Sequence, residues 1–249
     1  MKYLYLITLS LLIISCESTK QPEEIIDASI IDAGGNELNN TEIEFLFRDI
    51  EYGAKHQDGQ YEYVRLFKND SSELIRDVLT NNGFYREING EKVEVVDSMA
   101  TKYSNSINSV IYFALLPIKL DAPAVNPKML GQVEIKEKKY HKIQITFDKQ
   151  GGGSDYQDVF IYWFNTETNK VDYLAYSYET DGGGMRFREA YNERYVNGIR
   201  FVDYINYKPK SEIDLSSIDQ AFLSGQLDTL SKIEAESIKV NELNENIKM

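Results

Sequence analysis

Residues 158–164, with the sequence DVFIYWF, constrain the fold more than any other stretch of the chain. After Asp158, both alternating sets of side chains are apolar or aromatic, and they include Trp163, the single tryptophan. A strand with one face in water alternates apolar with polar residues, whereas a strand that is apolar on both faces is covered on both sides. We therefore expect residues 159–164 to form a central strand of a sheet, with other elements packed against each face.

Triple-glycine stretches lie on either side of this strand, at residues 151–153 and 182–184. Two strands and one turn separate them, so in an up-and-down meander both loops lie on the same rim of the sheet. Three consecutive glycines carry a high entropic cost, and a plain hairpin needs only one or two. The doubling indicates close backbone approach, a mobile lip or a ligand held by main-chain N–H groups, unless both loops are simply flexible turns.

Short strand-like segments joined by turn signals make up most of the remaining chain. Asp58-Gly59, Asn89-Gly90 and Asn197-Gly198 are typical two-residue hairpin turns. Hairpins without the alternation of a parallel sheet predict an antiparallel α+β domain. Helices are expected at 23–33, 97–116 and 214–222, and the last of these is expected to resume at 227–233. We also expect a proline-containing connector at 121–130 and an edge strand at 237–240.

Composition limits the class of protein and its partners. The 249 residues, 42% of them hydrophobic, suffice for one large domain with its own core. The formal net charge is −13, and no cluster of lysine and arginine occurs along the chain. A surface that binds nucleic acid needs such a cluster, so nucleic acid is not an expected partner.

The N-terminus contains Lys2, an apolar run and the sequence Ile13-Ile14-Ser15-Cys16. The run is too short to span a bilayer but fits the apolar region of a secretory signal peptide. Ile13 to Cys16 resemble a bacterial lipobox, in which the cysteine is diacylated before cleavage. Cys16 is also the single cysteine, so it forms no internal disulfide and a lipidated role accounts for it.

These signals divide the chain into three parts. We expect a lipoprotein signal peptide at residues 1–15, a flexible tether at 16–24 and one folded domain at 25–249. The acyl chains on Cys16 would anchor the protein to a membrane of the cell envelope. The expected location is the outer membrane, at its periplasmic face or at the cell surface.

The hairpin VFIYWFNTETNKVDYL, residues 159–174, and the order helix, hairpins, long helix, meander resemble the fold of bacterial lipoprotein carriers and binders (the LolA/LolB/LppX-like fold). The whole chain is similar to lipoproteins of unknown function from Bacteroidetes-type bacteria that share KYSNSINSVIYFALLP, GGGSDYQDVFIYW and TDGGGMRFREAY. The resemblance implies a curled antiparallel β-sheet, a half-barrel, with helices packed on its concave face. It implies no activity and no functional residues.

Charged and glycine residues gather at the expected rim. The candidate binding residues there are Gly151, Gly152, Gly153, Asp155, Asp158, Asp181, Gly182, Gly183, Gly184, Arg186 and Arg188. Asp155, Asp158 and Asp181 carry the oxygen ligands that suit calcium, but their spacing matches no known calcium loop. His56 and His141 lie far apart in the sequence and outside any paired ligand motif. We therefore predict neither a metal nor a cofactor.

Aromatic residues of the central strand, its neighbour and the long helix are the candidates for a cavity. The candidate lining residues are Tyr103, Tyr112, Phe160, Tyr162, Trp163, Tyr173 and Tyr176, each of which is also explained as ordinary core. No nucleophile elbow, P-loop, zinc-protease or dinucleotide motif occurs.

The favoured function is a non-catalytic binder or carrier of an apolar ligand, such as a lipid or a lipoprotein acyl chain, with the long helix as a plug. The alternatives are an envelope scaffold that binds a protein through the glycine-rich rim, and a hydrolase or lyase that uses a rim carboxylate as general base.

Overall fold

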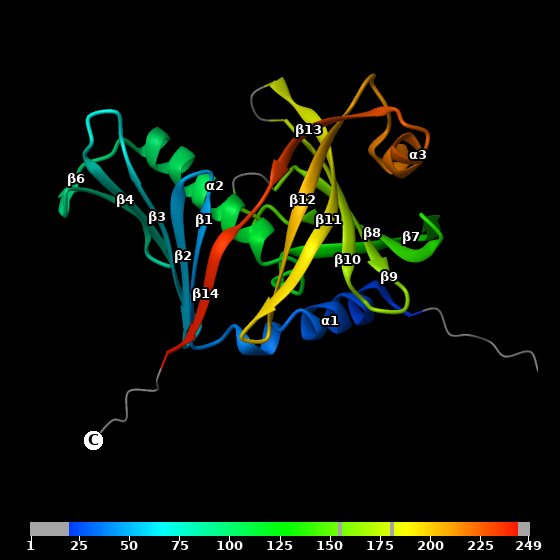
Figure 1. The fold of residues 1–249 in the computed structure, drawn as a ribbon, viewed down its shortest axis with the longest axis horizontal. Helices are drawn as coiled ribbons and strands as arrows, with labels where there is room; N and C mark the ends of the chain where they lie inside the picture. Colours follow the sequence, from blue (N-terminus) through cyan, green and yellow to red (C-terminus); the bar gives the residue numbers. More distant parts are fainter. Residues whose placement is uncertain (1–19, 154–155, 180–181, 244–249) are drawn as a thin grey trace, which may run out of the picture.

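The structure is a computed structural model that describes residues 20–153, 156–179 and 182–243. Its strands form two antiparallel sheets of seven strands each, which confirms the predicted antiparallel α+β fold. Both sheets are open, and Figure 1 shows them standing beside one another with α2 between them. The strands are therefore divided between two sheets.

The first sheet holds the N-terminal hairpins and the last strand of the chain. Its strands, in spatial order, are β14 (Glu236–Glu242), β1 (Thr41–Phe47), β2 (Ile50–Gln57), β3 (Gln60–Lys68), β4 (Leu74–Thr80), β5 (Gly83–Ile88) and β6 (Glu91–Val93). The predicted turns are present: Asp58 and Gly59 both have positive φ and join β2 to β3 as a two-residue hairpin loop.

The second sheet is the predicted meander. Its strands, in spatial order, are β13 (Leu227–Ile233), β12 (Ile199–Pro209), β11 (Gly184–Val196), β10 (Val171–Tyr178), β9 (Val159–Asn165), β8 (Lys138–Phe147) and β7 (Val125–Ile135). Both sheets meet at one side, where β13 runs into β14 after two residues and β14 contacts β11.

The central strand β9 is covered on both faces, as its sequence predicts. Trp163 points to one face and packs with Phe187 and Ile218, whereas Phe164 points to the other face and packs with Ile25 of α1. Trp163 and Phe164 are both fully buried. The position of β9 inside the sheet, covered on both sides, therefore follows from its two apolar faces.

Within the residues that the structure describes, three α-helices and two 3₁₀ turns accompany the sheets. They are α1 (Pro22–Asp32), η1 (Gly35–Glu37), α2 (Asp97–Ala114), η3 (Leu215–Ser217) and α3 (Ile218–Leu223). Helix α2 packs on the first sheet through Ile107 and Ile111, which share a core with Ile43 and Phe45. Helix α3 lies on the face of the second sheet that is opposite to α1, and there Ile218 joins the cluster around Trp163.

Several segments differ from the sequence-based expectation. Residues 227–233 form the edge strand β13 instead of a helix, because β12 offers them a partner strand. The expected connector holds the start of β7, and Pro127 is tolerated there because β7 is an edge strand. Helix α1 begins at Pro22, within the segment expected to be a tether, since proline is favoured in the first helical turn.

Candidate functional site

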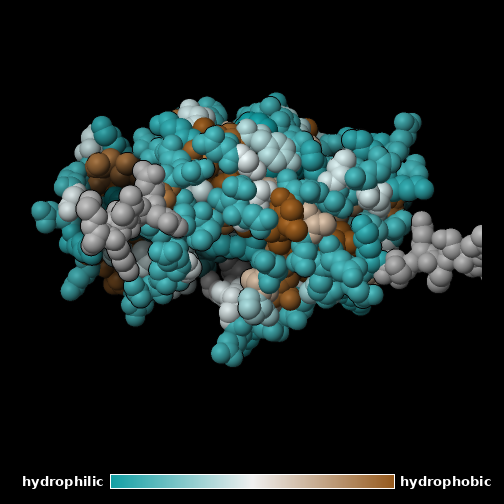
Figure 2. Space-filling model, turned by 90° about the horizontal axis from the view of Figure 1, so that it is seen from below, coloured by the Kyte–Doolittle hydropathy of each residue, from teal (hydrophilic) through white to brown (hydrophobic). Residues whose placement is uncertain are grey.

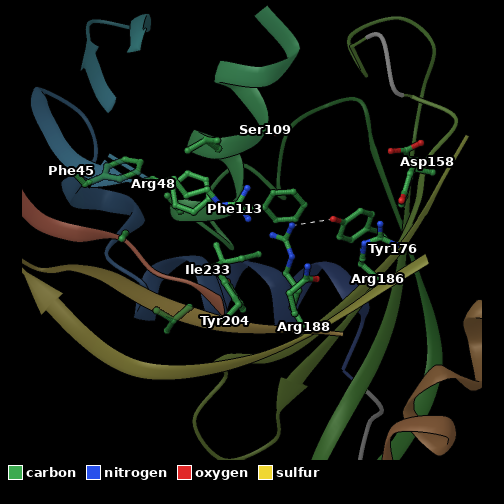
Figure 3. Close-up of a pocket in the computed structure, with 17 residues that line it drawn as sticks. Phe45, Arg48, Ser109, Phe113, Asp158, Tyr176, Arg186, Arg188, Tyr204 and Ile233 are labelled. Atoms are coloured by element: carbon green, nitrogen blue, oxygen red, sulfur yellow. Dashed lines mark hydrogen bonds between the residues drawn. The ribbon is translucent and has the colours of Figure 1, made fainter. Parts of the chain in front are cut away.

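A cleft of about 410 Å³ lies between α2 and the facing sides of the two sheets (Figure 3). Its walls come from β1 of the first sheet, from α2, and from β10, β11, β12 and β13 of the second. The lining residues are Phe45, Phe47, Arg48, Ser109, Val110, Phe113, Ala114, Asp158, Tyr176, Tyr178, Arg186, Arg188, Val202, Tyr204, Asn206, Ile233 and Ala235. The cleft thus exists because the strands form two sheets instead of one.

Aromatic rings form the wall between α2 and the second sheet. Phe113 of α2 lies 5.5 Å, centroid to centroid, from Tyr176 of β10, and behind this pair Phe160 of β9 lies 5.4 Å from Tyr176. Behind them the hydroxyl oxygens of Tyr112 and Tyr162 are 2.6 Å apart. The aromatic wall is therefore continuous with the core that holds α2 in place.

These buried hydroxyls are neutral. Burial raises the pKa of Tyr112, and burial together with the Tyr112 hydroxyl raises the pKa of Tyr162 well above its ordinary value. Burial also raises the pKa of Tyr204 on β12, although the charges of Arg200 and Arg188 oppose it. Phenols that stay protonated at neutral pH donate and accept hydrogen bonds and bring no charge to the wall.

Arg188, on β11, is the most buried charged residue of the cleft, with 7% of its surface exposed. Its Nη2 donates to Tyr176 Oη at 3.0 Å, and its guanidinium carbon lies 3.8 Å from the centroid of the Phe113 ring (Figure 3). Its Nε is buried without a hydrogen-bond partner, and so is Oδ1 of Asn206, its cross-strand neighbour on β12.

Two more arginines line the cleft closer to solvent. Arg186, partly buried, donates from Nη1 to the carbonyl oxygen of Met185 at 2.7 Å. Arg48, exposed, has its guanidinium carbon 5.0 Å from the ring centroid of Phe47. Asp158 is the single carboxylate among the described lining residues, so three cationic side chains face one anionic side chain.

The structure gathers some of the predicted site residues into this cleft and separates others. Asp158, Tyr176, Arg186 and Arg188 line it. The predicted residues Tyr112, Phe160 and Tyr162 lie in the core behind its wall, and Tyr103 packs against Phe84 and Arg86 of the first sheet.

Trp163 and Tyr173 lie on the opposite face of the second sheet, in the core beneath α3, so they do not reach the cleft. Alternate residues of a strand point to opposite faces, and the sequence did not show which face α3 covers. Asp155, Asp181 and Cys16 lie outside the described residues.

The triple-glycine loops lie at one end of the second sheet, as the pairing of Val159 with Ser177 requires. None of the six glycines lines the cleft. A side chain on Gly152 would place its Cβ 2.2 Å from the carbonyl oxygen of Asp148, so this glycine is demanded by close backbone approach. Gly183 has φ of +73°, a conformation that glycine adopts without strain.

Residues from the first sheet and from β12 were missed by the sequence analysis. Phe45, Phe47 and Arg48 reach the cleft only because the end of β1 faces the second sheet. No local pattern reports such a long-range approach. Tyr204 and Asn206 were detectable in part, since the Asn197-Gly198 turn predicts a strand after it and alternate residues of a strand face one side.

Buried charges elsewhere in the described structure are paired. Asp77, fully buried, accepts hydrogen bonds from Arg65 and Arg86 of the first sheet. Lys142 donates to Asp219 Oδ2 at 2.8 Å beneath α3. The described part of the chain has no group of three or more His, Cys, Asp or Glu residues placed to hold a metal, and no helix in that part is long and apolar enough to cross a membrane.

The surface on the α1 side is mainly hydrophilic. Figure 2, seen from that side, shows apolar side chains only in small patches among hydrophilic ones.

One protein family and several solved structures are similar to this chain. The model of a family of unknown function, DUF6503, matches residues 48–235. No curated protein sequence matches the chain. A LolA superfamily protein from Nitrosomonas europaea is similar in structure at 10% identity and a TM-score of 0.48, over 91% of this chain and 96% of that one. A putative outer membrane lipoprotein-sorting protein domain from Vibrio parahaemolyticus is similar at 7% identity and a TM-score of 0.47, over 90% of this chain and 94% of that one.

Proposed function

We propose that this chain, which belongs to the DUF6503 family of unknown function, is a lipid-anchored protein of the cell envelope that binds the apolar chain of an amphiphile without catalysis. The binding site is the cleft between the two sheets. The aromatic wall of the cleft would contact the apolar chain of the ligand, and α2 would form one side of the site.

The composition of the cleft carries this proposal. Its volume of about 410 Å³ falls in the usual range for small-molecule sites. Phe45, Val110, Phe113 and Ile233 supply apolar walls from three different elements, β1, α2 and β13. Apolar side chains that face one another across a space, with polar groups at a few positions, are typical of sites for amphiphilic molecules.

The polar groups of the cleft favour binding over chemistry. Ser109 is the single serine among the described lining residues, and no histidine or cysteine accompanies it there. A serine nucleophile needs a neighbouring base to take its proton. The cleft therefore offers hydrogen-bond donors and rings to a ligand, and no paired nucleophile and base.

The anchor is proposed from Cys16. Cys16 lies six positions before Pro22, where α1 begins. Even a fully extended chain of that length spans only about 20 Å. Acylation at Cys16 would therefore hold the folded domain against the membrane, within reach of an amphiphile that leaves the bilayer.

A series of n-alkanols tests the proposal without involving a charged head group. The protein is the mature chain, residues 16–249, with Cys16→Ser to prevent acylation. Each methylene that the cleft buries contributes about 0.8 kcal/mol, so affinity should rise about fourfold for each methylene from hexanol to decanol. Displacement of a fluorescent fatty probe measures it, and an affinity independent of chain length would rule out an apolar binding site.

A pair of substitutions on α2 locates the site. Ser109 and Thr101 are both exposed on α2, but Ser109 lines the cleft and Thr101 does not. Ser109→Trp should fill the cleft and weaken decanol binding at least tenfold, whereas Thr101→Trp should leave it unchanged. Equal effects of the two variants would place any alkanol binding elsewhere on the protein.

A further inference from the structure

We infer that the cleft selects an amphiphile with an anionic head group, a carboxylate or a phosphate, and that Arg188 binds this group. The inference rests on the proposed function and adds the class of ligand to it. Three observations support it: the burial of Arg188, its lack of a carboxylate partner among the described residues, and the excess of arginine over carboxylate along the cleft.

Burial makes the charge of Arg188 costly. The residue is 7% exposed, and a guanidinium does not lose its proton in a protein. A charge transferred from water into a protein interior needs a counter-ion and hydrogen bonds to offset its lost hydration. Tyr176 Oη and the face of Phe113 supply neutral contacts, and Nε has none.

The other buried arginines of the described chain each pair with a carboxylate, which offsets the cost of burying their charge. Arg65, 9% exposed, pairs with Asp77 at 2.5 Å. Arg200, 3% exposed, pairs with Glu193 at 2.5 Å. Arg188 is the third buried arginine, and within residues 20–153, 156–179 and 182–243 no ion pair involves it. The missing carboxylate is therefore the one that a ligand would bring.

The surroundings of Arg188 neither replace this counter-ion nor exclude it. Asn206 lies opposite Arg188 in the strand register, and its buried Oδ1 is able to accept a hydrogen bond but not to neutralise a charge. Burial raises the pKa of Tyr204, so its hydroxyl stays neutral at pH 7.

Two further arginines extend the positive charge from the interior toward solvent. Arg188 is buried, Arg186 is partly buried and Arg48 is exposed, and all three line the same cleft (Figure 3). With Asp158 as the single described carboxylate of the lining, the cleft is cationic in a protein whose formal net charge is −13. Such a local reversal of sign favours an anion over a neutral or cationic head group. Guanidinium groups bind carboxylates and phosphates through two parallel hydrogen bonds.

The test compares decanoate, decanol, acetate and inorganic phosphate as ligands of the same mature Cys16→Ser chain. Decanoate should bind roughly ten- to a hundredfold more tightly than decanol, because a hydrogen bond to a charged group is stronger than one between neutral groups. Acetate and phosphate, which lack the chain, should bind far more weakly than decanoate.

Substitution of Arg188 locates the anion. Arg188→Met should abolish the preference for decanoate and leave decanol binding unchanged, whereas Arg188→Lys, which keeps the charge, should retain part of the preference. Arg76→Met is the matched control: Arg76 lies in a different depression, on the first sheet, and pairs with Glu62 and Glu87. This variant should behave as the unsubstituted chain does.

Each outcome separates the inference from the proposed function. Equal binding of decanoate and decanol, or a preference that survives Arg188→Met, would overturn the anionic head group and leave the apolar site intact. Acetate or phosphate binding as tightly as decanoate would support an anion site at Arg188 and overturn the role of the apolar chain. Failure of both decanoate and decanol to bind would overturn both.

Discussion

Replacing Arg188 with methionine removes a buried charge that lacks a carboxylate partner within the described chain, so the ligand-free protein should lose little stability. Transfer of a guanidinium into a site that is 7% exposed costs several kcal/mol. The hydrogen bond to Tyr176 returns about 1.5–3 kcal/mol. The contact with Phe113 returns about 1–2 kcal/mol. These opposing contributions nearly cancel, and we expect the free energy of unfolding to change by less than about 1 kcal/mol in either direction.

Arg65→Met is the matched comparison for this prediction. Arg65 is buried to a similar extent, but it pairs with Asp77, whose side chain is fully buried. Removing one partner of a buried ion pair costs about 3–5 kcal/mol, and the low end applies here because Arg86 still pairs with Asp77. For a chain of this size, a loss of about 3 kcal/mol lowers the melting temperature by roughly 6–12 °C.

Urea unfolding followed by circular dichroism at pH 7, without any amphiphile, measures both variants and the unsubstituted mature chain. The expected result is a large loss for Arg65→Met and a small change of either sign for Arg188→Met. Equal losses would show that the free protein already compensates the charge of Arg188, and the reason for assigning an anion to the cleft would be gone.

Two further predictions concern other parts of the chain. Burial, with a smaller contribution from the Lys119 charge, lowers the pKa of His56 from its ordinary value of 6.5 to about 4. The stability that the neutral ring contributes is therefore complete above about pH 6.5 and is lost as the pH falls toward about 4. His56→Gln should remove this component from a plot of unfolding free energy against pH, and an unchanged plot would refute the assignment. Growth of an expressing bacterium with an alkyne analogue of palmitate should label the full-length protein and not its Cys16→Ser variant; label in both would exclude Cys16 as the acylated residue.

Local sequence predicted those parts of the fold that local chemistry determines. Two-residue turns such as Asp58-Gly59 set the hairpins, and the two apolar faces around Trp163 identified a strand covered on both sides. The place of β14 in the first sheet depends instead on its pairing with β1, in which Val240 lies opposite Ile43, far away in the sequence. Residues 227–233 were assigned to a helix because seven residues of mixed periodicity do not distinguish a helix from an edge strand.

Of the residues that line the cleft, the sequence predicted several that belong to the second sheet. Asp158, Tyr176, Arg186 and Arg188 come from neighbouring strands of the meander, and strand order alone brings them together. Arg48 was missed because it approaches them across the space between two sheets. The lack of a carboxylate beside Arg188 is likewise a property of packing, which no spacing in the sequence records.

Pairing of the last strand with the first also sets the order in which the protein can be completed. β1 is synthesised early, but its outer edge stays unpaired until β14, residues 236–242, has been made. A nascent or truncated chain therefore presents an unsatisfied row of backbone donors and acceptors, to which another strand can add. Contacts so distant in sequence form late in folding. The outer edge of β1 is thus the place at which an incompletely folded or truncated chain is open to aggregation, and a chaperone that shields this edge would protect it until β14 pairs there.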